Sequence, residues 1–204
     1  MDDKIIYFAT TNKAKVEVAR NHMTKYGYKV EQLFWAIDEP EYTNDSRVIA
    51  TEKALSAIKI APGPVICEDG GFFVDALGEQ PGVKVHGYLA SRNEYGEKGA
   101  KKLLREMAPY DERAAHFISV LAYMEKSMAG PVLFEERLDG VITRGVRGQL
   151  KPHSWSELHL IFVPSGADRT LAEMPYDEYE KFARSENENF RSLCRYLSSR
   201  LGDT

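Results

Sequence analysis

The sequence predicts an α/β protein, and three features of the chain lead to that prediction. The first is a strand-length apolar run, Ile5 to Ala9, which a short loop connects to a stretch with helical spacing. The second is the alternation of β-rich runs with amphipathic stretches along the rest of the chain. The third is size, because 204 residues with 43% apolar side chains can bury one sizeable core. One domain, or one domain with two lobes, is therefore expected over residues 1–204.

The first half of the chain is predicted to alternate strands and helices. Ile5 to Ala9 is apolar, short and rich in β-formers, which is typical of a buried strand. Helical spacing follows through Met23 until Gly27 ends it, and the residues before it can each cap a helix: Thr10, Thr11 and Asn12. We then expect a strand at 30–37, a helix at about 45–60, a strand at 65–67 and an apolar run at 72–77.

The second half is predicted to complete the sheet and close the domain. An amphipathic helix is expected at 98–107, antiparallel strands at 116–124 and 132–138, and a continuation of the sheet at 141–142. A short strand is expected at 159–163. Helical spacing over 176–201 predicts a single terminal helix.

Composition and charge narrow the classes of function. A net charge of −4 is typical of a soluble globular protein, whereas a binder of nucleic-acid polymers normally carries a basic face. The chain has no apolar run of about 18 residues, so no membrane helix is expected. The apolar run at the start has acidic flanks and is too short for a signal peptide. Cys67 and Cys194 provide no disulfide framework, so we expect a cytoplasmic protein.

The loop after the first strand has the chemistry of a phosphate site. A helix N-terminus offers unpaired N–H groups and a partial positive charge. Here it carries two hydroxyls, an amide and two lysines, in Thr10-Thr11-Asn12-Lys13-Ala14-Lys15. Lys15 is one turn beyond Asn12 and could project back toward a phosphate tail. The same pattern also fits an ordinary capped helix with solvated lysines, and spacing alone does not decide between them.

A second candidate is the acidic pair Glu68-Asp69, which we expect at the end of a strand, before a turn at Gly70-Gly71. The ends of strands are where α/β proteins usually bind ligands, and glycines let a backbone approach a substrate. Two carboxylates there could hold Mg²⁺ and orient a water molecule. The alternative is a surface turn, since all these residues are common in turns.

Taken together, the ordered motifs resemble the inosine triphosphate pyrophosphatase family. The similar stretches run in order from Ile5 to Met174: Thr10-Thr11-Asn12-Lys13-Ala14-Lys15, Pro40-Glu41-Tyr42, Glu68-Asp69-Gly70-Gly71 with Val74-Asp75-Ala76-Leu77-Gly78 and Pro81-Gly82, Phe162-Val163-Pro164-Ser165-Gly166, and Thr170-Leu171-Ala172-Glu173-Met174. The resemblance implies cleavage of a nucleoside triphosphate between the α- and β-phosphates, with Mg²⁺, and a preference for non-standard purine nucleotides such as ITP, dITP or XTP. It also implies a long mixed central sheet flanked by helices, two lobes with a cleft between them, and a homodimer.

The resemblance further assigns roles to individual residues. Asn12 and Lys15 would contact the triphosphate, with Thr10 and Thr11 as further donors. Lys53 would place a charge near the phosphates. The metal would be held by three carboxylates, Glu41, Glu68 and Asp69, and Asp69 would be the principal acid that activates the attacking water.

The base-recognition part departs from the family pattern. Residues 153–160 replace the expected Gly-Phe-Gly-Tyr-Asp-Pro, and Trp155 within them could stack on a base or serve as a core anchor. The expected Ser-His-Arg near the start of the last helix is absent, with residues 185–189 as the nearest match. Gly70 also stands where the family has serine. An alternative function is therefore a nucleotide-binding homologue that has lost turnover and has a regulatory or scaffold role.

Overall fold

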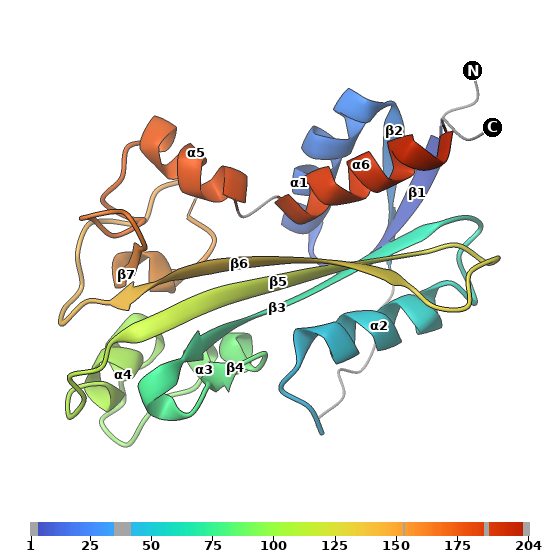
Figure 1. Ribbon diagram of the computed structural model, residues 1–204. Helices are drawn as coiled ribbons and strands as arrows, with labels where there is room; N and C mark the ends of the chain where they lie inside the picture. The colour runs from blue at the N-terminus through green and yellow to red at the C-terminus, as the bar shows by residue number, and fades with distance from the viewer. Residues whose placement is uncertain (1–3, 35–41, 153, 186–187, 202–204) are drawn as a thin grey trace. The chain divides into compact units, whose positions relative to one another are not determined.

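The computed structural model describes residues 4–34, 42–152, 154–185 and 188–201, and it has a mixed α/β architecture (Figure 1). The strands are β1 (Lys4–Ala9), β2 (Tyr28–Leu33), β3 (Val65–Val74), β4 (Gln80–Gly82), β5 (Ala114–Met124), β6 (Val132–Ile142) and β7 (Phe162–Pro164). The α-helices are α1 (Lys13–Met23), α2 (Ser46–Ala57), α3 (Val85–Ala90), α4 (Gly99–Glu106), α5 (Tyr176–Ser185) and α6 (Glu188–Leu201). None of these described helices is long and apolar enough to cross a membrane.

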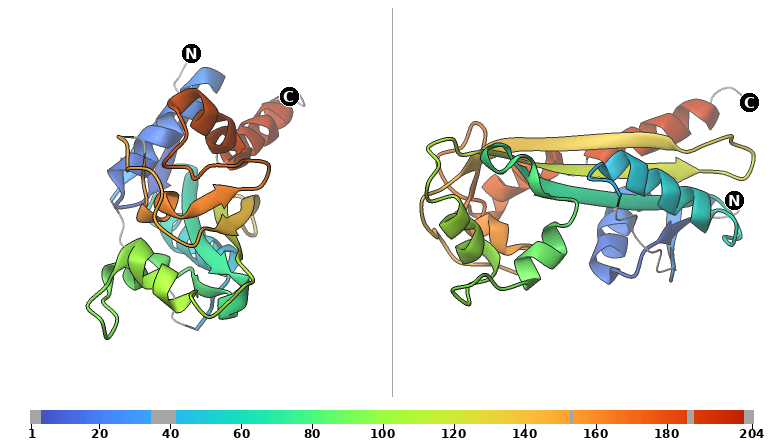
Figure 2. Two further views of the ribbon diagram at one scale, coloured as in Figure 1. Left: turned by 90° about the vertical axis from the view of Figure 1, so that its left-hand side faces the viewer. Right: turned by 90° about the horizontal axis from the view of Figure 1, so that it is seen from below.

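The strands of the described residues form one sheet in the order β2-β1-β3-β5-β6-β7, with β4 paired to β3. β1 pairs in parallel with both β2 and β3, whereas β3–β4 and β6–β7 are antiparallel. The sheet is therefore mixed, which confirms the predicted fold class. Figure 2 shows β3, β5 and β6 running side by side as the long strands of the sheet.

The chain divides into two compact units. Unit 1 comprises Met1–Asp69, Ser119–Glu136 and Asn187–Thr204, and unit 2 comprises Gly70–Ile118 and Arg137–Glu186. β3, β5 and β6 contribute residues to both. Each unit has its own apolar cluster of buried side chains. The expected cleft between two lobes stays a prediction.

In unit 1, helices cover both faces of the sheet. α1 and α6 pack against each other on one face, and α2 lies on the other (Figure 1). The core on the α1–α6 face includes Phe8, Met23, Leu121 and Leu193, all fully or nearly fully buried. Alternation along the strands explains this division, since successive side chains of a strand point to opposite faces.

In unit 2, the core gathers around aromatic rings from β3, β5 and β7. Phe72 lies edge-on to Phe162, with ring centroids 5.7 Å apart. Gly140 permits the close approach of β7 to β6, because a Cβ there would lie 2.3 Å from the Val163 carbonyl oxygen. α4 begins at Gly99, and in its first turn the Ala100 N–H donates to the Glu157 carboxylate at 3.4 Å.

Three sequence expectations were wrong in detail. The predicted turn at Gly70-Gly71 lies within β3, which continues to Val74. Gly71 serves strand pairing, because a Cβ there would lie 2.8 Å from the Gly82 backbone of β4. The predicted terminal helix is two helices, α5 and α6, which belong to different units. In the stretch 159–163, residues 159–160 end a 3₁₀ helix (Glu157–Leu160) and only residues 162–163 belong to a strand, β7. In addition, α3 was not predicted.

Candidate functional site

The loop between β1 and α1 is held in place by hydrogen bonds to its own side chains and to β2. The Thr10 N–H donates to the Leu33 carbonyl at 3.2 Å, and Gln32 Nε2 donates to the Thr10 carbonyl at 2.9 Å. The Asn12 N–H donates to Thr10 Oγ1 at 3.1 Å, and Asn12 Oδ1 caps α1 by accepting from the Lys15 N–H at 3.4 Å. β2 therefore fixes the position of the first turn of α1. Thr11 and Asn12 lie exposed at its start.

Lys15 and Glu68, which are 53 positions apart in sequence, meet in unit 1. Lys15 Nζ lies 3.7 Å from Glu68 Oε1, and the carboxylate side chain is only 16% exposed. Ser119 of β5 donates its hydroxyl to the same Oε1 at 3.0 Å. Two of the predicted residues therefore share one place, beside the N-terminal turn of α1.

Asp69 has a different partner. Its Oδ1 lies 2.8 Å from Lys53 Nζ of α2, and the residue is 5% exposed. The neighbouring Cys67 lies buried on the same strand, and burial raises the pKa of its thiol to about 12 although Lys53 lowers it in part. The thiol is therefore neutral near pH 7, as expected for an inert buried cysteine.

Glu68 and Asp69 do not share a face of the sheet. They are consecutive residues within β3, so their side chains point to opposite faces. Their partners agree, since Lys15 lies on α1 and Lys53 on α2, which cover opposite faces. Glu41, the third predicted metal ligand, lies outside the described residues. Within the described ranges, no three His, Cys, Asp or Glu side chains are grouped to hold a metal ion.

Trp155 belongs to unit 2 and lies at its surface. Its side chain is 58% exposed, so it is not a buried core anchor. One edge of the ring packs on Phe117, with centroids 5.2 Å apart, and another on His159 at 4.8 Å. Phe117 in turn contacts Phe162 at 4.9 Å. An aromatic cluster thus supports an exposed indole ring.

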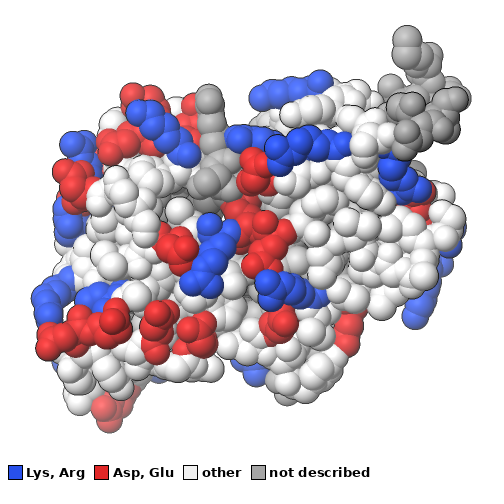
Figure 3. Space-filling view, in the orientation of Figure 1, with Lys and Arg blue, Asp and Glu red and all other residues white. Residues whose placement is uncertain are grey.

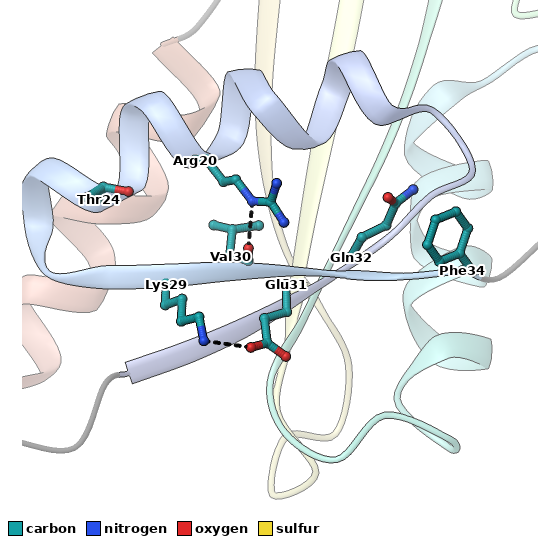
Figure 4. Close-up of a pocket in the computed structure, with 7 residues that line it drawn as sticks. All are labelled: Arg20, Thr24, Lys29, Val30, Glu31, Gln32 and Phe34. Atoms are coloured by element: carbon teal, nitrogen blue, oxygen red, sulfur yellow. Dashed lines mark hydrogen bonds and ion pairs between the residues drawn. The ribbon is translucent and has the colours of Figure 1, made fainter.

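A surface hollow of about 540 Å³ lies elsewhere on unit 1, between α1 and β2 (Figure 4). Its charged groups are engaged with one another or with backbone. Arg20 Nε donates to the Val30 carbonyl at 3.0 Å, and Lys29 pairs with Glu31 at 2.9 Å. None of the predicted site residues lines this hollow, so we do not take it as the site.

Charge is mixed at the surface. On the face shown in Figure 3, basic and acidic side chains are interspersed. That face therefore presents no continuous basic surface of the kind that binds nucleic-acid polymers.

Ser119 lies beside Glu68 and Asn189 lies behind Ser119, and neither residue was predicted from the sequence. Asn189 Nδ2 donates to Ser119 Oγ at 3.1 Å. The only local signal for Ser119 was a polar residue inside an apolar strand, while Asn189 follows the start of a helix, where asparagine is common.

Comparison with known proteins places residues 6–187 within the Ham1 family. A protein named dITP/XTP pyrophosphatase from Hyperthermus butylicus is 33% identical over 97% of this chain and 96% of its own length. A protein of the same name from Thermococcus kodakarensis is 31% identical over 95% and 97%. The structure of a HAM1 protein from Coxiella burnetii superposes with a TM-score of 0.78, at 21% identity, over 96% of this chain and 99% of the other.

Proposed function

Because this chain belongs to the Ham1 family, we propose that it hydrolyses nucleoside triphosphates to monophosphate and pyrophosphate, with non-standard purine nucleotides such as dITP and XTP as substrates. The observation that carries the proposal is the family match over most of the chain. It agrees with the resemblance found in the motifs. The names of the full-length relatives supply the substrate class.

The proposed phosphate-binding group is the first turn of α1 with Lys15. Thr10, Thr11 and Asn12 would offer hydroxyl, amide and backbone donors, and the helix N-terminus adds partial positive charge. A triphosphate repels an incoming hydroxide, so cations and N–H groups at its oxygens stabilise the charge of the transition state. The fixed position of this turn against β2 supports the assignment. Lys53 remains the weaker candidate for a phosphate contact, since its amine is paired with Asp69.

Mg²⁺ is the proposed cofactor, and the chemistry of the donors fits it. Magnesium prefers carboxylate oxygens and is usually held by one or two of them together with substrate phosphates and water. The absence of a three-residue cluster among the described residues is therefore compatible with this ion. Glu41, Glu68 and Asp69 are the candidate ligands, and the ion would neutralise phosphate charge. Glu68 and Asp69 point to opposite faces of β3, so one ion would take only one of these two carboxylates, with Glu41, water and substrate oxygens as its other ligands.

Asp69 is the proposed principal acidic residue, and its carboxylate would act as the general base that accepts the proton of the attacking water. Its ion pair with Lys53, at 2.8 Å, fixes the position of this carboxylate. Trp155 is the proposed base-stacking residue, supported by its exposed ring on an aromatic cluster.

We also propose that the protein is a homodimer. Light scattering on the purified protein tests this.

The proposal is tested by incubating the purified chain with ITP, dITP, XTP and the four standard triphosphates, with and without Mg²⁺. We expect pyrophosphate and monophosphate in equal amounts, fastest from the non-standard purines and only with the metal. Release of orthophosphate instead would contradict cleavage between the α- and β-phosphates. Binding without any release would favour the non-hydrolysing homologue, for which the missing Ser-His-Arg is the specific observation.

A further inference from the structure

A chain of hydrogen bonds connects the start of α6 to Glu68 through the interior of unit 1. Asn189 is 1% exposed and donates from Nδ2 to Ser119 Oγ at 3.1 Å. Ser119 donates to Glu68 Oε1 at 3.0 Å, and Lys15 Nζ lies 3.7 Å from the same oxygen. Three elements, α6, β5 and α1, thus converge on one carboxylate of β3.

In this series of hydrogen bonds, the other partners of each group determine which atom donates and which accepts. Asn189 Oδ1 accepts from the Phe190 N–H at 2.7 Å, so the amide nitrogen must be the atom that faces Ser119. An ionised carboxylate only accepts, so the single hydroxyl proton of Ser119 goes to Glu68. The hydroxyl oxygen is then left to accept from Asn189. If any one of these donors were reversed, the hydrogen bonds from Asn189 to Glu68 could not all form.

We propose that Asn189 is a positioning residue that acts through Ser119 to hold Glu68 beside Lys15 at the phosphate-binding turn. The proposal rests on the proposed function and adds a residue that no motif assigns. Asn189 is too buried to touch a nucleotide, so it would act on the substrate only through other residues, here Ser119 and Glu68. It lies at the start of the last helix, where the resemblance leads one to expect Ser-His-Arg and this chain has neither His nor Arg.

A simpler role for Asn189 is that of a structural residue that stabilises the start of α6. Its N–H lies 3.4 Å from Glu136 Oε2, and its side chain accepts from Phe190. Asn189→Asp separates the two roles. Aspartate has the same shape and still accepts from the Phe190 N–H, but in its ionised form it cannot donate to Ser119, so the kinetics are measured at alkaline pH, which favours that form. Ser119→Ala removes the middle residue of the hydrogen-bond series. Because Ser119 lies on β5 and not on α6, this substitution is an independent second variant.

The kinetic test measures KM and kcat for the best triphosphate in both variants, alone and combined with Glu68→Gln. Ser119→Ala removes a hydrogen bond to a charged group and should raise KM about tenfold. Asn189→Asp removes a bond between two neutral groups and should raise KM about fivefold. The effect on kcat should be smaller in both variants. In the Glu68→Gln background, either change should alter KM less than about twofold, because coupled sites are not additive. Ser192→Ala is the matched control. It is also a serine-to-alanine change, but this serine lies on α6 and its hydroxyl accepts from Arg195. Wild-type KM in both single variants, or full effects that persist without Glu68, would overturn the proposal.

A second measurement does not depend on turnover. The side-chain amide of Asn189 is assigned in ¹⁵N NMR spectra as the signal that Asn189→Asp removes. We expect Ser119→Ala and Glu68→Gln to shift this signal, and Ser192→Ala to leave it in place. If the wild type hydrolyses no triphosphate, the proposed function fails while a shifted amide still supports the positioning chain. If neither substitution shifts the Asn189 amide signal, the proposed series of hydrogen bonds is contradicted, whether or not the enzyme is active.

Discussion

At the scale of single residues, Asp69 is the side chain on which the proposed chemistry depends most. Asp69→Asn keeps the shape of the side chain and removes its ability to take a proton. We expect kcat to fall at least about a hundredfold, the low end for loss of a positioned proton acceptor. Asp139→Asn is the matched control, since that carboxylate is 57% exposed and pairs only with Arg137 among the described residues. Steady-state rates with the preferred nucleotide make the comparison, and wild-type turnover in Asp69→Asn removes this residue from its role.

The Lys53–Asp69 pair should also matter for stability, independently of catalysis. Both side chains are largely buried, at 14% and 7% exposure. Lys53→Met leaves a buried carboxylate without its ion-pair partner, which costs about 3–5 kcal/mol in the free energy of unfolding. Urea denaturation measures this, and the double variant Lys53→Met/Asp69→Asn should recover much of the loss. Lys29→Met, which breaks an exposed pair with Glu31, should change stability by less than about 1 kcal/mol. Equal effects in the two methionine variants would contradict the importance of burial.

His116 of β5 should make unit 2 sensitive to acid. Burial lowers the pKa of His116 below its ordinary value of 6.5, and Arg137 lowers it further, while Glu79, Asp75 and Asp139 act in the opposite direction. The unfolded chain therefore takes up a proton near pH 6.5 that the folded chain refuses. This contribution to stability is complete above pH 6.5 and is lost as the pH falls below it toward the folded pKa.

The measurement is the free energy of unfolding at about pH 7.5 and about pH 5.5, on either side of the histidine range. The wild type should lose more stability over this interval than His116→Gln, which has no proton to gain. His86→Gln, at an exposed position, is the control and should keep the wild-type pH dependence. An identical pH dependence in the wild type and His116→Gln would show that another group is responsible.

Some of this residue-scale picture was accessible from the sequence. The motifs predicted that Lys15 and Glu68 serve one site, and the two side chains do meet. Ser119 and Asn189 could not be predicted, because their roles depend on which side chain faces them across the sheet. Opposite orientations for Glu68 and Asp69 follow from strand geometry alone. They were missed because the pair was placed at the end of a strand, before a turn at Gly70-Gly71, and not inside a strand that continues.

At the scale of secondary structure elements, the pairing of β3 with β4 depends on the absence of a side chain at Gly71. A Cβ there would lie 2.7 Å from the Phe73 ring and 2.8 Å from the Gly82 backbone, and backbone atoms cannot move aside cheaply. Gly71→Ala should therefore lower the free energy of unfolding by about 1–3 kcal/mol, as overpacking does. Gly87→Ala in α3 is the matched control, because a Cβ there meets nothing within 4 Å. Thermal and urea unfolding should show the control unchanged or more stable by up to about 1 kcal/mol. A neutral Gly71→Ala would mean that the strands adjust.

Elements themselves were predicted well where periodicity is strong, as for α1, α2 and β5. Gly70-Gly71 was misassigned to a turn because glycines, which favour turns, also allow two strands to approach closely. The terminal helix was misassigned for another reason. Helical spacing is a local property, and it does not reveal that Tyr179 of α5 joins the core of unit 2 while Leu193 of α6 joins that of unit 1.

At the scale of the whole molecule, sequence order identified the family, but local patterns could not predict how the chain divides. Three of the four boundaries between the two units fall inside β3, β5 and β6, and the fourth falls between α5 and α6. Neither unit therefore contains a complete set of its own strands. If one unit unfolded alone, β3, β5 and β6 would each have to end midway, and backbone N–H and C=O groups at those points would lose their hydrogen-bond partners.

We therefore expect the two units to unfold together. Leu193→Ala in the core of unit 1 and Leu103→Ala in that of unit 2 should each cost about 2–5 kcal/mol, since both side chains are fully buried. In a Trp35→Phe background, fluorescence reports only Trp155 of unit 2, while far-UV circular dichroism reports both units. If unfolding is cooperative, the urea midpoints from the two signals coincide. Leu193→Ala then shifts the Trp155 midpoint although the substitution lies in the other unit. A Trp155 transition that ignores Leu193→Ala but follows Leu103→Ala would mean that each core unfolds on its own.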